Sequence, residues 1–148
     1  MDAPVEFVKE LLPTIVNIHT TIPRAHPSSR ILGEERMGSG VVVDASGLLL
    51  TVNYVVMGAN TIEVAPLKGR RSKAEVVAQD FEVGLALVRT KRPGLTPAPL
   101  DATKPPERGD PVIAIASTIR AHSAGSVQSS ASPISSSSGR TTCSLTSE

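Results

Sequence analysis

The chain has 148 residues, enough for one well-packed domain and a tail; 40% of them are hydrophobic and 20% are charged. Its formal net charge is +1, so it lacks the concentrated basic field that binds nucleic acids or anionic membranes. Only 2% of the residues are aromatic, too few for a base-stacking platform. No stretch approaches the roughly 18 apolar residues of a spanning helix, so we expect neither a nucleic-acid partner nor a membrane span.

Candidate metal ligands and nucleophiles are few and scattered. Cys143 is the single cysteine, which excludes an internal disulfide, and the three histidines (His19, His26 and His122) show no ligand spacing. We therefore predict no metal and no cofactor. A run of basic residues flanks Gly69: Lys68, Arg70, Arg71 and Lys73. Charged residues beside a glycine usually lie on a solvated hairpin turn, and we favour that interpretation here.

Residues 1–12 are predicted to form a short amphipathic helix. Apolar residues recur there at helical spacing and stop at Pro13. Charged residues interrupt the segment, so it does not read as a secretory signal, and any export signal is expected upstream of Met1. The compartment therefore stays open.

From Pro13 onward the pattern changes to period two. Two proline-containing segments interrupt this alternation: a loop over 22–35 and a connector over 91–108. Tight turns are expected around 45–47 and 68–70. Short strands at this spacing are typical of an all-β fold, here a single closed antiparallel six-stranded β-barrel over residues 13–122. The expected strands are 14–21, 40–44, 48–52, 61–66, 73–78, 85–90 and 111–116.

The composition changes after His122. Residues 123–148 contain 11 serines and only three large aliphatic residues, too few to offset the backbone entropy of ordering, about 1–2 kcal/mol per residue. We predict a disordered Ser-rich tail, with a short strand near 125–130. The abrupt change also suggests a frameshifted or truncated end.

Four segments, in order, resemble the first barrel of HtrA/Deg-type trypsin-like serine proteases. The main one is GSGVVVDASGLLLTVNYVV over 38–56; the others are TIVNI over 14–18, the turn, strand and LALV over 68–88, and RGDPVIAI over 108–115. In that family a Leu-Thr-x-x-His-Val-Val segment carries the catalytic histidine, and an Asp-x-x-x-Asp-Leu-Ala-Leu segment carries the aspartate that orients it. The resemblance covers about residues 13–117 and implies a serine endopeptidase domain.

The same alignment implies that the catalytic residues are missing. Tyr54 stands at the histidine position and Gly84 at the aspartate position, and no Gly-x-Ser-Gly-Gly motif occurs; the nearest string, over 137–140, continues into Arg140. An imidazole, with a reference pKa of about 6.5, accepts a proton near neutral pH, whereas a phenol, near 10, keeps its own. Losing any one triad member costs orders of magnitude in rate. We therefore expect a truncated, degenerate domain without proteolytic activity.

Ordinary structural roles also account for the residues singled out. Tyr54 is expected to be a half-buried tyrosine with its hydroxyl at the surface, and Gly84 a strand-entry or bulge residue. Asp80 is expected to cap a loop rather than act as a displaced acid, and His19 to be a plain strand residue. His122 and its neighbour Ser123 do not form a dyad, because neighbours in an extended chain point to opposite faces.

Two further hypotheses remain. One is a regulatory barrel that binds peptides or proteins, or that self-associates through an exposed barrel face. The other is the product of a disrupted protease gene without a selected function. Translating the coding DNA beyond His122 in all three frames separates them, because a Gly-x-Ser-Gly-Gly in another frame favours the disrupted gene.

Overall fold

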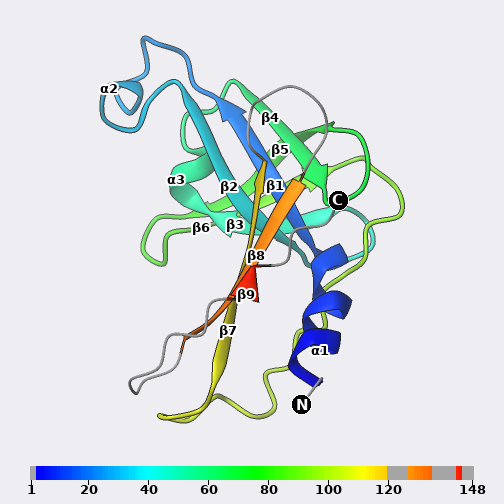
Figure 1. The fold of residues 1–148 in the computed structure, drawn as a ribbon. Coiled ribbons are helices and arrows are strands. Elements are labelled where there is room, and N and C mark those ends of the chain that lie inside the picture. Colours follow the sequence, from blue (N-terminus) through cyan, green and yellow to red (C-terminus); the bar gives the residue numbers. More distant parts are fainter. Residues whose placement is uncertain (1–2, 120–126, 135–142, 145–148) are drawn as a thin grey trace.

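The computed structural model describes residues 3–119, 127–134 and 143–144 (Figure 1). Within these residues, none of the helices combines the length and the apolar character needed to cross a membrane. Three short α-helices and one 3-10 helix accompany the strands: α1 Ala3–Leu11, η1 Leu12–Thr14, α2 Ser29–Leu32 and α3 Asn53–Val56. The strands are β1 Ile15–Thr21, β2 Glu35–Val42, β3 Leu48–Val52, β4 Thr61–Pro66, β5 Ser72–Asp80, β6 Leu85–Thr90, β7 Val112–Ile119, β8 Val127–Ile134 and β9 Cys143–Ser144.

Six strands close into an antiparallel barrel in the order β1-β2-β3-β6-β5-β4. The first strand joins the two ends of this order: its Ile18 lies opposite Gly38 of β2 on one side and opposite Val64 of β4 on the other. Closure gives each strand two hydrogen-bonded neighbours and removes the open ends of the sheet. The predicted all-β fold with a six-stranded antiparallel barrel and a short N-terminal helix is confirmed.

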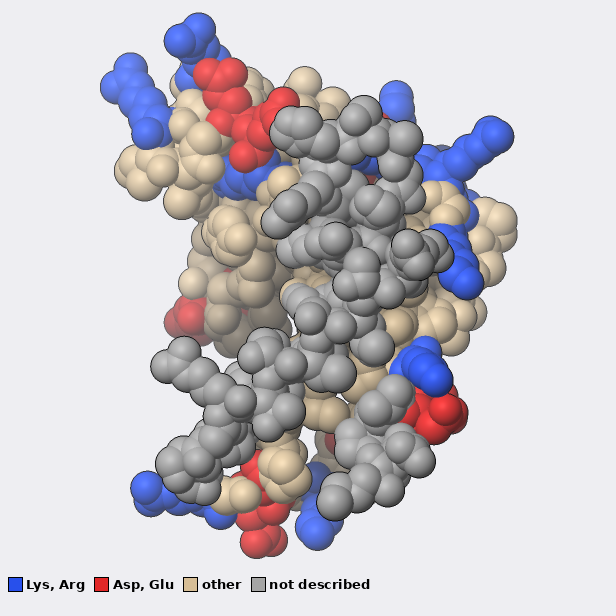
Figure 2. All heavy atoms as spheres, viewed as in Figure 1, with Lys and Arg blue, Asp and Glu red and all other residues tan. Residues whose placement is uncertain are grey.

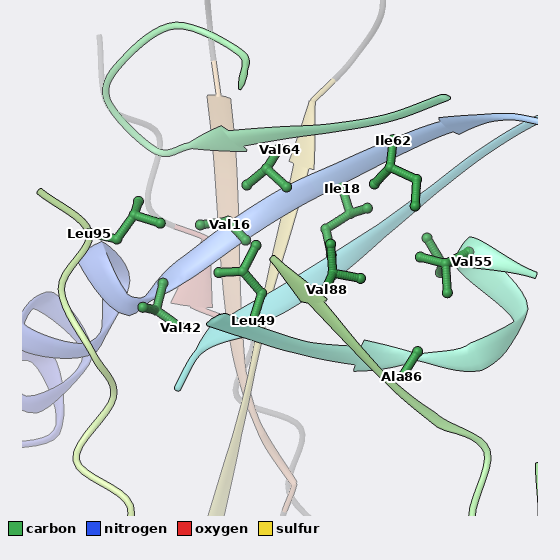
Figure 3. Packing of buried hydrophobic residues seen from close by; sticks show 11 residues of the cluster. Val16, Ile18, Val42, Leu49, Val55, Ile62, Val64, Ala86, Val88 and Leu95 are labelled. Carbon is green, nitrogen blue, oxygen red and sulfur yellow. The ribbon is translucent and has the colours of Figure 1, made fainter. Parts of the chain in front are cut away.

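The barrel interior is filled by aliphatic side chains, many of them β-branched (Figure 3). Alternate residues of each strand point inward, so Val16 and Ile18 of β1 meet Leu49 of β3 and Val88 of β6, all fully buried. Each such side chain contributes roughly 1.5–3 kcal/mol through burial. The buried cluster comprises Val16, Ile18, Val42, Leu49, Val55, Val56, Ile62, Val64, Ala86, Val88 and Leu95.

The structure differs from the predicted element boundaries around β2. This strand begins at Glu35, earlier than the predicted 40, and its first half pairs with β1 up to Thr21. Glycines at positions 38 and 40 carry no side chain, so the inward positions of the strand show no hydrophobic alternation. The predicted loop over 22–35 also contains α2, and the unpredicted α3 follows β3 directly.

The last predicted strand does not join the barrel. β7 pairs with β8, which in turn pairs with β9, in a separate three-stranded sheet. Strand β7 crosses the outside of β1 and β2 (Figure 1). There Ser117 N donates to Ser39 Oγ at 2.8 Å, and Asn17 Nδ2 donates to Ser117 O at 3.1 Å. The expectation that 111–116 forms a strand is confirmed, but its assignment to the first barrel is wrong, because the six preceding strands already close.

The predicted tail falls only partly within the described residues. The short strand expected near 125–130 overlaps β8, which is longer and runs from Val127 to Ile134. The disorder expected for the rest of 123–148 concerns mainly residues outside those described and stays a prediction. The domain boundary predicted at 122 also stays a prediction, because it falls on such residues.

Candidate functional site

The structure brings positions 54 and 84 together at adjacent ends of β3 and β6. Val52, the last residue of β3, lies opposite Leu85, the first residue of β6. One residue further out, Asn53 N donates to Gly84 O at 2.7 Å. Tyr54, the second residue of α3, therefore follows directly on the residue that is bonded to Gly84.

The short helix α3 points Tyr54 away from the core. Val55 and Val56 are buried in the barrel end, whereas Tyr54 is 50% exposed, as the sequence predicts for a half-buried tyrosine. The phenol has no hydrogen-bond partner among the described residues. Gly38 makes room for the helix, because a Cβ at that position would lie 2.5 Å from Val55 Cγ2.

Polar contacts attach α3 to strands β5 and β1. Asn53 is buried, and its Oδ1 accepts from Gln79 Nε2 of β5 at 2.6 Å. On the other side, Thr20 Oγ1 of β1 donates to Val55 O at 2.7 Å. The backbone at position 54 is thereby fixed, although the side chain it carries is a phenol.

Arg36 is the polar residue at this site that the sequence analysis missed. Its side chain is only 4% exposed and donates through one guanidinium nitrogen to Tyr54 O at 2.7 Å and Met57 O at 3.0 Å. Its Nε is buried without a partner among the described residues. Arg36 shares the inward face of β2 with Gly38 and Val42, but the glycines leave no hydrophobic alternation that would mark this face in the sequence.

Gly84 adopts a left-handed backbone conformation, with φ of +80°. Its N–H donates to Asp80 O at 2.9 Å, and Asp80 Oδ1 accepts from Glu82 N at 2.9 Å and Val83 N at 3.0 Å. Asp80 thus caps the β5–β6 turn, as predicted, and its oxygens are turned toward the backbone. A Cβ at position 84 would meet nothing within 4 Å, so this position faces open space.

The histidines within the described residues, His19 and His26, form no catalytic arrangement with Tyr54 or Gly84. His19 Nε2 lies 3.9 Å from Glu35 Oε2. His26 Nδ1 lies 2.6 Å from Ser28 Oγ, but it also accepts from Ser28 N at 3.2 Å, and Arg36 donates to the same hydroxyl at 2.7 Å. This contact closes a local turn in the loop before α2.

The remaining sequence candidates lie elsewhere. His122, Ser123 and the string at 137–140 are outside the described residues. No group of three or more His, Cys, Asp or Glu side chains suited to a metal ion occurs in the described ranges.

Lowered carboxyl pKa values occur in exposed turns: the Ser46 hydroxyl lowers the pKa of Asp44, and the Thr103 hydroxyl lowers that of Asp101. Neither carboxylate belongs to the site at 54 and 84.

The comparisons with known proteins agree with this architecture. A family model described as "Trypsin-like peptidase domain" matches residues 38–146. Serine endoprotease DegS of Escherichia coli (strain K12) is 31% identical over 109 residues, which are 73% of this chain and 30% of DegS. Periplasmic serine endoprotease DegP of Salmonella typhimurium (strain LT2) is 37% identical over 81 residues, which are 53% of this chain and 17% of DegP.

A solved structure shows the same fold relationship. The crystal structure of the serine endoprotease from Yersinia pestis superposes with a TM-score of 0.63 at 27% identity, covering 84% of this chain and 42% of that one. This chain spans less than a third of the length of DegS. The HtrA/Deg resemblance found in the sequence is confirmed, and the chain belongs to the family of trypsin-like peptidase domains.

Proposed function

We propose that this chain retains the trypsin-like barrel but does not hydrolyse peptides. The observation that carries the proposal is the pair Tyr54 and Gly84. These residues stand where the family resemblance calls for a catalytic histidine and its aspartate, and Asn53, the residue before Tyr54, donates its N–H to Gly84 O at 2.7 Å.

Neither residue supplies the chemistry that serine proteolysis requires. The general base must remove a proton from the nucleophile near neutral pH and return it to the leaving amine, a task suited to imidazole and not to a phenol. Gly84 has no side chain to orient such a base. The nearest aspartate in the sequence is Asp80, and its carboxylate accepts two backbone N–H groups within its own turn.

The experiment is a direct test of turnover and of active-site labelling. The purified chain is incubated with fluorescent casein, with a small peptide ester and with a fluorophosphonate probe, and trypsin serves as the positive control. We expect no turnover above the buffer rate and no covalent label. Hydrolysis that disappears after a single substitution in this chain would overturn the proposal, because it would reveal a catalytic residue elsewhere.

A further inference from the structure

The charge of the molecule is unevenly distributed. Seven basic side chains surround the β4–β5 turn and the outer surface of β5 and β6, and we call this surface the basic face. Figure 2 shows Lys and Arg side chains projecting on the right, the side on which Figure 1 places that turn. The basic face consists of Lys68, Arg70, Arg71, Lys73, Arg89, Lys91 and Arg92.

These seven residues are nearly half of the 15 lysines and arginines in the chain. Three carboxylates lie near them, those of Glu63, Glu75 and Asp44, the last of which interacts electrostatically with Arg89, so the basic face has a formal charge of +4. Since the whole chain carries +1, the rest of the molecule carries −3. The near-neutral net charge of the chain is therefore the sum of a positive basic face and a negative remainder.

Strand alternation explains why these side chains gather. Ala74 and Thr90 lie opposite each other across β5 and β6, and Thr90 is 1% exposed and points inward. Their neighbours Lys73, Arg89 and Lys91 therefore point outward. Along each strand the outward positions repeat every second residue, at roughly 6.6–6.8 Å.

The basic face is hollowed and partly held in place. A depression of about 530 Å³ lies over β5, β6 and the segment after β6, lined by Lys73, Arg89, Lys91 and Arg92. Arg92 donates to Arg70 O at 2.6 Å, which ties that segment to the β4–β5 turn. This contact restrains the turn, and such restraint lowers the entropic cost of binding.

Most of the positive charge has no internal partner. Arg71 pairs with Glu63 at 3.3 Å. The other six cations of the basic face have no carboxylate oxygen within 4.0 Å among the described residues. Their charge is available to an external anion, and guanidinium groups such as those of Arg89 suit carboxylates particularly well.

We propose that the basic face binds an acidic segment of a polypeptide chain. In an extended peptide, carboxylates on alternate residues lie on one side at the repeat that separates Arg89 from Lys91. The face offers no aromatic side chain on which bases would stack, since the aromatic residues of the chain are Phe7, Tyr54 and Phe81. The proposal goes beyond the loss of hydrolysis and does not depend on it.

The test is a titration followed by fluorescence anisotropy at 50 mM salt. The ligand is a fluorescein-labelled peptide of six Glu-Ser repeats, and the matched neutral peptide has six Gln-Ser repeats. We expect the acidic peptide alone to bind, with an affinity that falls as salt is raised. Replacing Lys73, Arg89 and Lys91 together by glutamine should weaken binding about tenfold, since each exposed ion pair contributes modestly.

One substitution should act in the opposite direction. Glu75→Gln removes a carboxylate from the depression and should tighten binding about twofold. The control changes Arg30 of α2 and Arg108 of the connector before β7, both exposed and outside the basic face, to glutamine and should leave binding unchanged. Thermal unfolding of each variant shows that it is folded, and the single variants Lys73→Gln and Glu75→Gln serve if the triple variant is not.

Three results would overturn the proposal. The first is equal weakening by the control pair and by the basic-face variants. The second is binding that neither Glu75→Gln nor Lys73→Gln changes. The third is stronger binding of single-stranded DNA of matched charge, or of vesicles containing anionic lipid, than of the acidic peptide.

Discussion

Arg36 is the residue on which the geometry around position 54 depends most. A buried guanidinium is costly unless its donors are satisfied, and here it holds two carbonyls of the α3 turn, those of Tyr54 and Met57, as well as the Ser28 hydroxyl. Arg36 therefore acts as a structural clamp between β2, the loop before α2 and the end of α3.

Replacing Arg36 should destabilise the folded protein. Arg36→Met keeps the aliphatic stem but removes every donor, and we expect the free energy of unfolding to fall by about 2–3 kcal/mol because buried carbonyls lose charged partners. Urea denaturation followed by circular dichroism measures the change. Met37→Gln, on the outward face of the same strand, is the control and should shift stability by less than about 0.5 kcal/mol. An Arg36→Met variant as stable as the parent would contradict the clamp.

Sequence reasoning reached part of this site and missed the rest for a physical reason. Tyr54 and Gly84 could be located because a sequence motif fixes their positions, and Asp80 could be recognised as a turn cap because its chemistry is local. Arg36 could not, since its carbonyl partners lie 18 and 21 residues away in the chain. Long-range partners of a polar group depend on the packing of whole elements.

Among the elements, the turn between β5 and β6 is built on local backbone conformation. Asp80 caps it at one end and Gly84 closes it with φ of +80°, a conformation that side chains other than glycine adopt at a cost. Because a Cβ at position 84 would face open space, the cost of a substitution there comes from the backbone alone.

This turn yields a graded prediction. Gly84→Ala should lower the free energy of unfolding by about 1–2 kcal/mol, the penalty of a left-handed alanine. Gly84→Asn should cost less, because asparagine tolerates that conformation better. Thermal unfolding of the two variants beside the parent measures the order. Equal stability of the alanine variant and the parent would show that position 84 does not need a positive φ in solution.

At the scale of the whole molecule, the strands were predictable but their partners were not. Period-two patterning located five of the six barrel strands to within two residues, because each needs one face in the core, but it found only the last residues of β2. The same pattern in 111–116 gave a strand that belongs to a different sheet. Pairing is decided by barrel closure and by contacts such as Asn17 to Ser117, which join residues 100 positions apart.

The proposed lack of hydrolysis can be tested further at the scale of the whole molecule. We expect the double variant Tyr54→His and Gly84→Asp to show no turnover of casein and no fluorophosphonate label. A new imidazole needs a serine hydroxyl within about 3 Å, and the oxyanion needs its own donors, worth roughly 3–4 kcal/mol in transition-state stabilisation. The new aspartate would moreover stand on a strained left-handed backbone and face open space.

The informative contrast joins the same double variant to a second barrel that carries Gly-x-Ser-Gly-Gly. That chimera supplies the nucleophile and the oxyanion donors. Label that appears in the chimera, but not in the double variant alone, attributes the remaining deficit to those two components. A chimera built on the parent barrel, with Tyr54 and Gly84 retained, controls for the added barrel and should stay unlabelled. Labelling of the double variant by itself would contradict the prediction, because a serine of this chain would then have to lie within reach of position 54.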